Sequence, residues 1–370
     1  MKNHGDIMFA RLLLSLLILL LTAIPSMAAD LDTMIGQMLL AGFRGYTVDA
    51  KSPIIRDIRD YHLGGVILFD YDVELGKPER NIKSPEQVSK LTEDLDAAAS
   101  LPLFISVDQE GGRVQRLKPA YGFPSTPSAQ ELGAGEDERV LLAGRSVGRT
   151  LQDAGFNVDF APVADVNVDP DSPAIGKIGR SFSADPNRVA LCDRLFLHGL
   201  AENYVIGCLK HFPGHGSAGA DSHLGMVDVT QTWSEAELIP YRKLIGNGTA
   251  KMIMTAHIFN AKLDPKYPAT LSHKVITGIL RDQLGYNGVV VTDDMNMRAI
   301  TDHYGQEEAI RLAIEAGADI LLFGNNLRFD PDIVPKAHGI IKQLVKDGKV
   351  SEARIAQSYA RIMRLKDGMD

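Results

Sequence analysis

Residues 210–228 read KHFPGHGSAGADSHLGMVD and concentrate side chains that can move protons. Three histidines, two aspartates and four glycines fall within these nineteen residues. Histidine and aspartate transfer protons near neutral pH or bind metals, and glycine lets the backbone bend sharply and approach a ligand. The segment therefore predicts a functional loop whose chemistry is either metal binding or acid–base catalysis.

The spacing within this loop favours acid–base catalysis. His211 and His215 have the His-x₃-His spacing of a helical metal site, but Pro213 lies between them and forbids a regular helix. Asp221 and His223 are two residues apart, so the carboxylate can hold the imidazole, fix its tautomer and raise its basicity. His215 also has a simpler interpretation, a structural hydrogen bond within a tight loop.

A second candidate is the acidic pair Asp293 and Asp294, which follows an apolar run at 288–291. Adjacent residues that leave a strand point to opposite sides, so we expect only one of the two acids to face a pocket readily. A carboxylate in that position suits a nucleophile or an electrostatic stabiliser. The other acid suits capping of the turn at residues 295–300.

The motif DQEGGRVQR, which begins at Asp108, combines acids with Arg113 and Arg116. This set suits a polyhydroxylated ligand, because a carboxylate accepts from two hydroxyls at once. Arg180 and Lys210 can donate to hydroxyls or to a carbonyl. The structural alternative for each is a salt bridge around the pocket, above all for Arg113. A carboxylate nucleophile, a separate proton donor and hydroxyl recognition together indicate glycoside cleavage.

The elements that must position these residues follow from the apolar pattern. From residue 30 on, eight short runs rich in Val, Ile, Leu and Phe alternate with amphipathic stretches, as expected of strands covered on both faces. The predicted strands are 38–42, 65–69, 103–107, 158–166, 207–209, 252–256, 288–291 and 320–323. The predicted helices are 85–99, 136–153, 186–203, 235–245, 274–284, 306–316, 335–346 (with Pro335 at its first position) and 352–365 (with Ser351 as its N-cap).

Eight strand–helix units predict an α/β fold, a (β/α)₈ TIM barrel in a single domain over residues 30–370. A doubly wound open sheet is the rival, weakened because no GxGxxG follows an early strand. In a barrel, catalytic groups gather past the carboxyl ends of the strands. Charged or histidine side chains stand at these positions: Asp108, Asp165, Lys210, His211, His257 and Asp293. We expect them to converge on one polar pocket.

Composition limits the partners and the compartment. The chain is 45% hydrophobic with a net charge of −8, which indicates a globular protein and argues against a nucleic-acid partner. Residues 1–29 combine Lys2 and Arg11 with an apolar run at 12–23 and small residues near a cleavage site, the layout of a secretory signal peptide. The run is shorter than the roughly 20 residues of a membrane span. We therefore expect a periplasmic or secreted monomer with no stable membrane span after processing.

Cys192 and Cys208 are the only cysteines. Both lie in apolar patterns, which favours small buried residues, although an exported chain can also pair them. A cysteine-based zinc site is not supported.

The motifs carry a family resemblance. KHFPGHG followed by DSH, with DQEGGRVQR upstream, GRSF between and TDDMNM downstream, resembles the β-N-acetylglucosaminidases of glycoside hydrolase family 3 over about residues 34–366. That family implies a (β/α)₈ barrel and a retaining double displacement with no metal or other cofactor. The implied substrate is a saccharide with a terminal β-linked N-acetylglucosamine, on a cell-wall fragment or chito-oligosaccharide.

The resemblance implies roles residue by residue. Asp293, the first acid of TDD, matches the nucleophile, and His223 matches the general acid/base with Asp221 as its partner. The implied sugar-binding residues are Asp108, Arg116, Arg180, Lys210 and His211. The Asp-His pair favours N-acetylglucosamine, because many members that recognise glucose carry a glutamate acid/base on a second domain.

Two features depart from the family pattern. Single-domain members that recycle cell-wall fragments usually sit in the cytoplasm, whereas this chain carries an export signal, and residues 71–82 form a longer, more charged turn than is usual. Three other functions stay open: a β-N-acetylglucosaminide phosphorylase, a non-catalytic sugar-binding protein of the cell envelope, and a metal-dependent amidohydrolase on the same barrel. A requirement for phosphate would indicate the phosphorylase, and activity that survives a strong chelator would exclude the amidohydrolase. A non-catalytic sugar-binding protein could dispense with Asp293 and His223.

Overall fold

Eight parallel strands close into a barrel in this computed structural model, which describes residues 29–78, 80–220 and 225–369. The sheet order is β11-β9-β7-β6-β3-β2-β1-β12. Their bounds are β1 Leu39–Gly42, β2 Gly65–Ile67, β3 Phe104–Val107, β6 Val158–Asp159, β7 Ile206–Phe212, β9 Met252–Thr255, β11 Val289–Val291 and β12 Leu321–Phe323. A parallel bridge between Val291 and Ile320 joins the two ends of this order. The predicted (β/α)₈ barrel is confirmed, and the doubly wound alternative is wrong.

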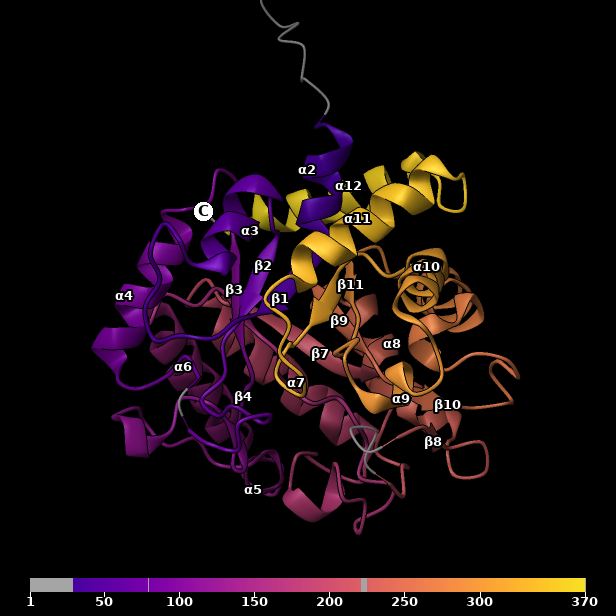
Figure 1. The fold of residues 1–370 in the computed structure, drawn as a ribbon. Coiled ribbons are helices and arrows are strands. Elements are labelled where there is room, and N and C mark those ends of the chain that lie inside the picture. The colour runs from indigo at the N-terminus through magenta and orange to yellow at the C-terminus, as the bar shows by residue number, and fades with distance from the viewer. Residues whose placement is uncertain (1–28, 79, 221–224, 370) are drawn as a thin grey trace, which may run out of the picture. The chain divides into compact units, whose positions relative to one another are not determined.

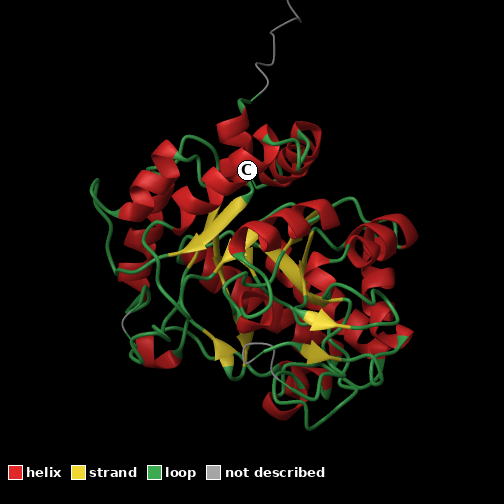
Figure 2. Cartoon of the chain, turned by 45° about the vertical axis from the view of Figure 1, so that its right-hand side comes forward, coloured by secondary structure: helices red, strands yellow, loops and turns green. Residues whose placement is uncertain are grey.

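Helices surround the strands (Figure 1), and the turned view separates an inner ring of strands from an outer ring of helices (Figure 2). The long helices are α2 Leu31–Gln37, α3 Pro53–Asp60, α4 Pro85–Asp96, α6 Asp137–Asp153, α7 Pro186–Ala201, α8 Ile239–Gly246, the π-helix η6 Lys274–Gln283, α10 Gln306–Ala316, α11 Ile333–Lys346 and α12 Glu352–Lys366. The shorter ones are α5 Ala129–Gly133, α9 Arg298–Thr301 and the 3₁₀ turns η1 Pro119–Tyr121, η2 Gly176–Ile178, η4 Glu235–Leu238 and η5 Ala269–Leu271.

Two small sheets sit in the loops that follow the barrel strands. The antiparallel pair β4 (Gln109–Gly111) and β5 (Val114–Gln115) follows β3, and the parallel pair β8 (Val227–Asp228) and β10 (Ile258–Phe259) joins the loops after β7 and β9. These pairs give the loops backbone hydrogen bonds of their own, so the site residues they carry do not depend on the barrel strands alone.

Local chemistry explains where several elements begin and end. The Ser351 hydroxyl accepts from the Arg354 N–H at 3.2 Å, so its predicted role as an N-cap is confirmed. The placement of Pro335 at the first helical position is wrong, because α11 begins at Ile333; proline is tolerated there because N–H groups of a first turn have no helical partner. The strand predicted at 158–166 ends at Asp159, before Pro162, which has no N–H to donate to a ladder.

The two cysteines are buried and free, so the alternative of a disulfide is wrong. Burial raises the pKa of the Cys192 thiol to about 12, which keeps it protonated and inert at neutral pH. The prediction of small buried residues is confirmed for both.

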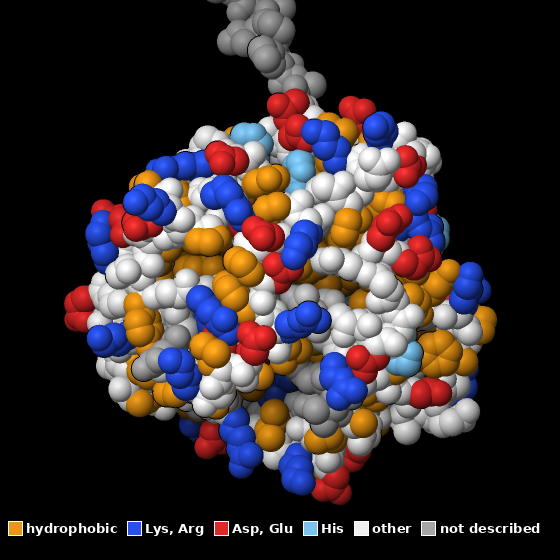
Figure 3. Space-filling view, in the orientation of Figure 1, with side chains coloured by type: hydrophobic (Ala, Val, Ile, Leu, Met, Phe, Trp, Pro, Cys, Tyr) orange, Lys and Arg blue, Asp and Glu red, His pale blue; other side chains and the backbone are white. Residues whose placement is uncertain are grey.

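The barrel brings its first and last helices together. Residues 31–370 cluster as one unit, and within it α2 packs against α11 and α12 (Figure 1). On the face shown in Figure 3, basic and acidic side chains are interspersed. Within the described ranges no helix is both long and apolar enough to cross a membrane. The predicted signal peptide, residues 1–29, lies almost wholly outside the described residues and stays a prediction.

Candidate active site

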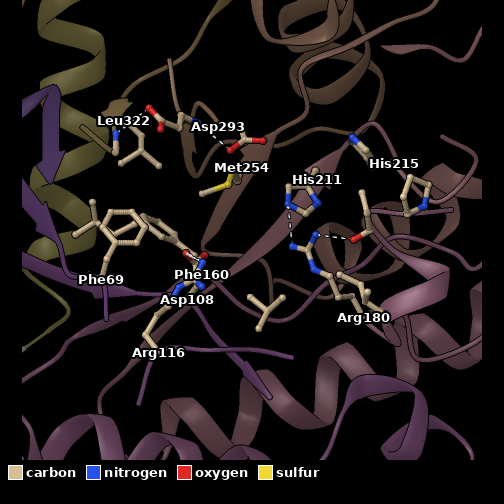
Figure 4. Close-up of a pocket in the computed structure, with 17 residues that line it drawn as sticks. Phe69, Asp108, Arg116, Phe160, Arg180, His211, His215, Met254, Asp293 and Leu322 are labelled. Atoms are coloured by element: carbon tan, nitrogen blue, oxygen red, sulfur yellow. Dashed lines mark hydrogen bonds and ion pairs between the residues drawn. The ribbon is translucent and has the colours of Figure 1, made fainter. Parts of the chain in front are cut away.

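A cavity of about 240 Å³ lies where the carboxyl ends of the strands meet. Its apolar lining includes Ile67, Phe69, Phe160, Met254 and Leu322. Its polar lining consists of Asp108, Arg116, Arg180, His211, His215, Asp293 and Asp294. Figure 4 shows Asp293 and Met254 on one side of the cavity, with Asp108 and Arg116 across from them. The predicted convergence of strand-end side chains on one pocket is confirmed for Asp108, His211 and Asp293. Asp165, Lys210 and His257, predicted with them, are buried outside the lining.

Asp108 follows β3 and stands between two cations. Its carboxylate accepts from Lys210 Nζ at 2.8 Å and from Arg116 Nη2 at 3.3 Å. Burial alone would raise the pKa of Asp108, but the charges of Lys210 and Arg116 outweigh it and hold that pKa well below its usual range. The group is therefore an anionic acceptor, and its side chain keeps 15% of its surface exposed toward a ligand.

Glu110 is a site residue that sequence reasoning missed. It is buried in β4, accepts two hydrogen bonds from Arg180 at 2.7 and 2.8 Å, and lies 2.7 Å from Lys210 Nζ. This bidentate contact fixes the guanidinium plane at the cavity wall. The sequence could have indicated Glu110, because it lies two residues after Asp108 and alternate residues of an extended chain point to the same side.

Lys210 differs from the other predicted sugar-binding residues. Its ammonium is held by Asp108 and Glu110, its side chain is 3% exposed, and it does not belong to the cavity lining. Lys210 therefore sets the charge of Asp108, and its predicted contact with the sugar stays a prediction. Arg113, which belongs to the DQEGGRVQR motif with Asp108, is exposed and also lies outside the cavity lining.

Asp165 organises the two histidines that line the cavity. One of its oxygens accepts from the backbone N–H of His211 at 3.1 Å and of His215 at 2.8 Å, and the other lies 2.7 Å from His211 Nδ1. Burial would raise the pKa of Asp165, but His211 lowers it to about 2. Burial together with His211 lowers the pKa of His215 to about 4, so that imidazole is neutral at pH 7. The structural interpretation of His215 agrees with this contact.

Asp293 and Asp294, the two acids after β11, make different contacts. Asp293 and Asp294 both line the cavity, but Asp294 Oδ1 accepts from the backbone N–H of Gly324 at 2.8 Å and of Asn296 at 2.9 Å. Its carbonyl lies 2.9 Å from His257 Nε2. Asp294 is thus engaged in fixing the loops after β11 and β12, as its predicted capping role requires. Asp293 accepts from the Asp294 N–H at 2.8 Å, and its role as the nucleophile stays a prediction.

Asp221 and His223 lie outside the described residues, so their predicted roles stay predictions. The described chain reaches Ala220 after the segment that carries His211 and His215, and it resumes at Gly225 before β8. The metal interpretation started from His211 and His215, which the structure describes. Within 29–78, 80–220 and 225–369, no group of three or more His, Cys, Asp or Glu side chains has the arrangement of a metal site.

The longer turn after β2 is fixed by buried charges. Asp72 accepts from Arg44 and from Arg80 at 2.7 Å each, and both Asp72 and Arg80 are fully buried. The Asn326 side chain bonds the backbone of Tyr71 and Val73, which ties the turn to the loop after β12. These contacts join residues 71–73 and Arg80 to the loops after β1 and β12.

Comparison with known proteins identifies the family. The family described as "Glycosyl hydrolase family 3 N terminal domain" matches residues 30–365. The chain belongs to glycoside hydrolase family 3. The family resemblance seen in the motifs is thereby confirmed.

Relatives of this chain are named for a more specific activity than the family is. Beta-hexosaminidase A of Pseudoalteromonas piscicida is 32% identical over 373 residues, covering 90% of this chain and 60% of that protein. Beta-hexosaminidase LpqI of Mycobacterium tuberculosis is 33% identical over 353 residues, which cover 93% of this chain and 84% of that protein. A family 3 beta-N-acetylglucosaminidase from Paenibacillus sp. str. FPU-7 superposes with a TM-score of 0.84 at 37% identity, covering 92% of this chain and 63% of that one. The chain spans less than two thirds of the first and third of these proteins.

Proposed function

We propose that this family 3 barrel is a retaining exo-β-N-acetylglucosaminidase that releases terminal β-linked N-acetylglucosamine from cell-wall fragments or chito-oligosaccharides. The observation that carries the proposal is the placement of Asp293 across one cavity from the ionised Asp108. The names of its relatives, beta-hexosaminidases and a beta-N-acetylglucosaminidase, support the same reaction.

In the first step, Asp293 attacks the anomeric carbon of the bound sugar. The new bond joins a carboxylate oxygen to that carbon, and the bond from the carbon to the leaving oxygen breaks. His223, held by Asp221, gives its proton to the leaving oxygen, the role that family membership assigns to this pair. The product is a covalent glycosyl–Asp293 intermediate.

In the second step, water replaces Asp293. His223, now neutral, takes a proton from the water as its oxygen attacks the anomeric carbon from the face that the leaving group vacated. Two inversions at one carbon restore the original configuration, so the released sugar keeps the β configuration.

Recognition falls to the charged wall of the cavity. Asp108 accepts from two sugar hydroxyls, because Lys210 and Arg116 keep it ionised. Arg180, oriented by Glu110, and His211, oriented by Asp165, supply donors along the same wall. Phe69, Phe160 and Met254 cover the apolar faces of the sugar and exclude water. A cavity of about 240 Å³ suits one sugar unit, which favours cleavage at chain ends.

A pair of substrates tests the reaction. The purified protein should cleave nitrophenyl N-acetyl-β-glucosaminide at least about 10²-fold faster, by kcat/KM, than the matching β-glucoside, since sites that hydrogen-bond a substrate group reject analogues without it. NMR of the first released sugar should show the β anomer. Addition of phosphate should yield no sugar phosphate, and a chelator should leave the rate unchanged. Release of the α anomer, or equal cleavage of the glucoside, contradicts the proposal.

We further propose that residues 1–29 direct export and are removed, and that the mature chain is a monomer. The positive start and the apolar run at 12–23 support export. Cell fractionation followed by N-terminal sequencing should find a mature chain beginning near residue 30 outside the cytoplasm. Light scattering should give one chain per particle. An unprocessed cytoplasmic chain contradicts the export proposal.

A further inference from the structure

Glu237 is a buried carboxyl group that the reaction described above does not use. It lies in η4, it is fully buried, and it does not belong to the cavity lining. Its Oε2 accepts from the Gly216 N–H at 3.0 Å. A Cβ atom at Gly214 would lie 2.5 Å from the Glu237 Cβ. Glu237 therefore packs directly against the backbone of residues 211–217, which we call the histidine segment.

The histidine segment is also held by Asp165, through the N–H groups of His211 and His215. Gly216 is packed closely on both sides, because a Cβ atom there would lie 1.7 Å from the Val166 carbonyl oxygen and its N–H donates to Glu237. No side chain fits at this position. Two buried carboxylates thus fix the backbone whose side chains, His211 and His215, form one wall of the cavity.

We propose that Glu237 is a positioning residue for glycoside cleavage, acting through the backbone of Gly216 to hold His211 and His215 in the cavity wall. This inference deepens the proposed function and rests on it for its catalytic readout. An anionic carboxylate is a stronger hydrogen-bond acceptor than a neutral acid. The segment is therefore held most firmly when Glu237 is ionised.

The ionisation of Glu237 falls in the physiological range. Burial raises its pKa to about 7, against hydrogen bonds from Ser217 and Gly216 that lower it. The titratable groups around it and around the histidine segment are Asp165, Asp193 from α7, Tyr241 from α8, His211 and His215. Burial also raises the pKa of Asp193 well above its usual range, so Asp193 is the neighbour whose titration must be separated from that of Glu237.

The chain carries its own reporter of this contact. Trp233 is the single tryptophan, it is buried, and its Nε1–H donates to the Pro213 carbonyl of the histidine segment at 3.0 Å. A change in how the segment is held alters the surroundings of this indole. Its fluorescence therefore reads the segment without any need for substrate.

The experiment compares the parent protein with Glu237→Gln, which has the same shape and an acceptor oxygen but no charge to lose. Parent fluorescence should change through a transition near pH 7 that disappears in E237Q. The ratio of parent kcat/KM to E237Q kcat/KM should fall by up to about tenfold from pH 8 to pH 6, as the ionised fraction of such a group does, because the titration of His223 is common to both proteins and cancels in the ratio. Glu237→Asp, one methylene shorter, should keep the transition and raise KM.

Asp193→Asn is the matched control, since it removes a buried carboxyl whose oxygens make no hydrogen bond to the histidine segment among the described residues. D193N should keep the fluorescence transition and the parent pH profile. The inference is overturned if the transition survives in E237Q, or if D193N abolishes it. If the parent cleaves no N-acetylglucosaminide, the proposed function fails, while the fluorescence arm still decides whether Glu237 holds the segment.

Discussion

Asp319 at the amino ends of the strands and Asp108 at the carboxyl ends are both carboxylates surrounded by cations, yet they differ in what remains available. Asp319 is fully buried, and it accepts from Arg281 at 2.7 Å, Arg361 at 3.1 Å and the Val290 N–H at 3.0 Å. Asp108 accepts from Lys210 and Arg116 and keeps 15% of its side chain exposed at a cavity.

The difference shows how one barrel separates stability from chemistry. At the amino ends both oxygens of Asp319 accept hydrogen bonds from side chains of the fold, Arg281 on one and Arg361 on the other. At the carboxyl ends the cations leave Asp108 with lone pairs that face the cavity. Changes at the amino ends should therefore lower the free energy of unfolding, whereas changes at the carboxyl ends should lower catalytic activity.

The largest effect is expected at Asp293. Asp293→Asn should lower kcat by about 10⁴-fold, the typical loss when one member of a catalytic group is removed, with little change in the unfolding midpoint. Asp294→Asn is the control, since its retained oxygen can still accept from Gly324 and Asn296. It should keep activity within about tenfold. If D294N were inactive and D293N active, the assignment of the nucleophile would be reversed.

A smaller catalytic effect is expected at Asp108. Asp108→Ala should lower kcat/KM by about 10²-fold, mainly through KM, because it removes a charge-assisted acceptor for sugar hydroxyls and leaves Arg116 without that partner. Arg113→Ala, in the same motif but exposed, should stay within about twofold. Steady-state kinetics on both variants provide the measurement. Equal losses in the two would mean that the motif acts through general charge and not through contact.

At the amino ends, Asp319→Asn should destabilise the fold and spare catalysis. Removing the charge leaves Arg281 and Arg361 without their common carboxylate, a loss of about 3–5 kcal/mol in the free energy of unfolding. Urea unfolding measures this loss, and kcat/KM of the folded variant should match the parent. A fall in kcat/KM with unchanged stability would remove the contrast between the two ends.

The smallest effect concerns Lys366, which is fully buried and donates to Gln37 Oε1, the Gly64 carbonyl and the Pro102 carbonyl. Burial lowers its pKa from 10.5 to about 7. Between pH 7 and 10.5 the unfolded chain binds more protons than the folded one, so this group adds stability as pH rises.

Lys366→Met should therefore flatten the rise in unfolding free energy between pH 7 and 10. Thermal or urea unfolding at several pH values provides the test, with kcat/KM at pH 7 expected to stay at the parent value. A parent protein whose stability does not rise over this range relative to the variant would contradict the assignment.

Several features of the site could be predicted because they are local in sequence. The apolar runs without alternation identified all eight barrel strands, and the rule that catalytic groups follow strand ends selected Asp108, His211 and Asp293. The helix predicted at 235–245 instead divides into η4 and α8, with Pro240 in the first turn of α8. The period of the hydrophobic residues alone does not show where a 3₁₀ turn replaces an α-helix.

Other features depended on contacts between distant residues. Glu110 pairs with Arg180 across 70 positions, and Asp165 holds His211 across 46. Nothing in the spacing of either pair distinguishes a cavity wall from a surface ion pair. For the same reason the sequence did not show that Asp108 and Glu110 together hold the Lys210 ammonium.

The sequence by itself determined the barrel class, the family and the acids and histidines available for chemistry, because hydrophobic period and short motifs are properties of neighbouring residues. Only the tertiary structure decided which charges meet. Coulomb energies and burial depend on distances through space, and the closing of the barrel sets those distances between residues far apart along the chain. That is why Asp108 and Asp319, similar acids in the printed sequence, serve a ligand in one place and the fold in the other.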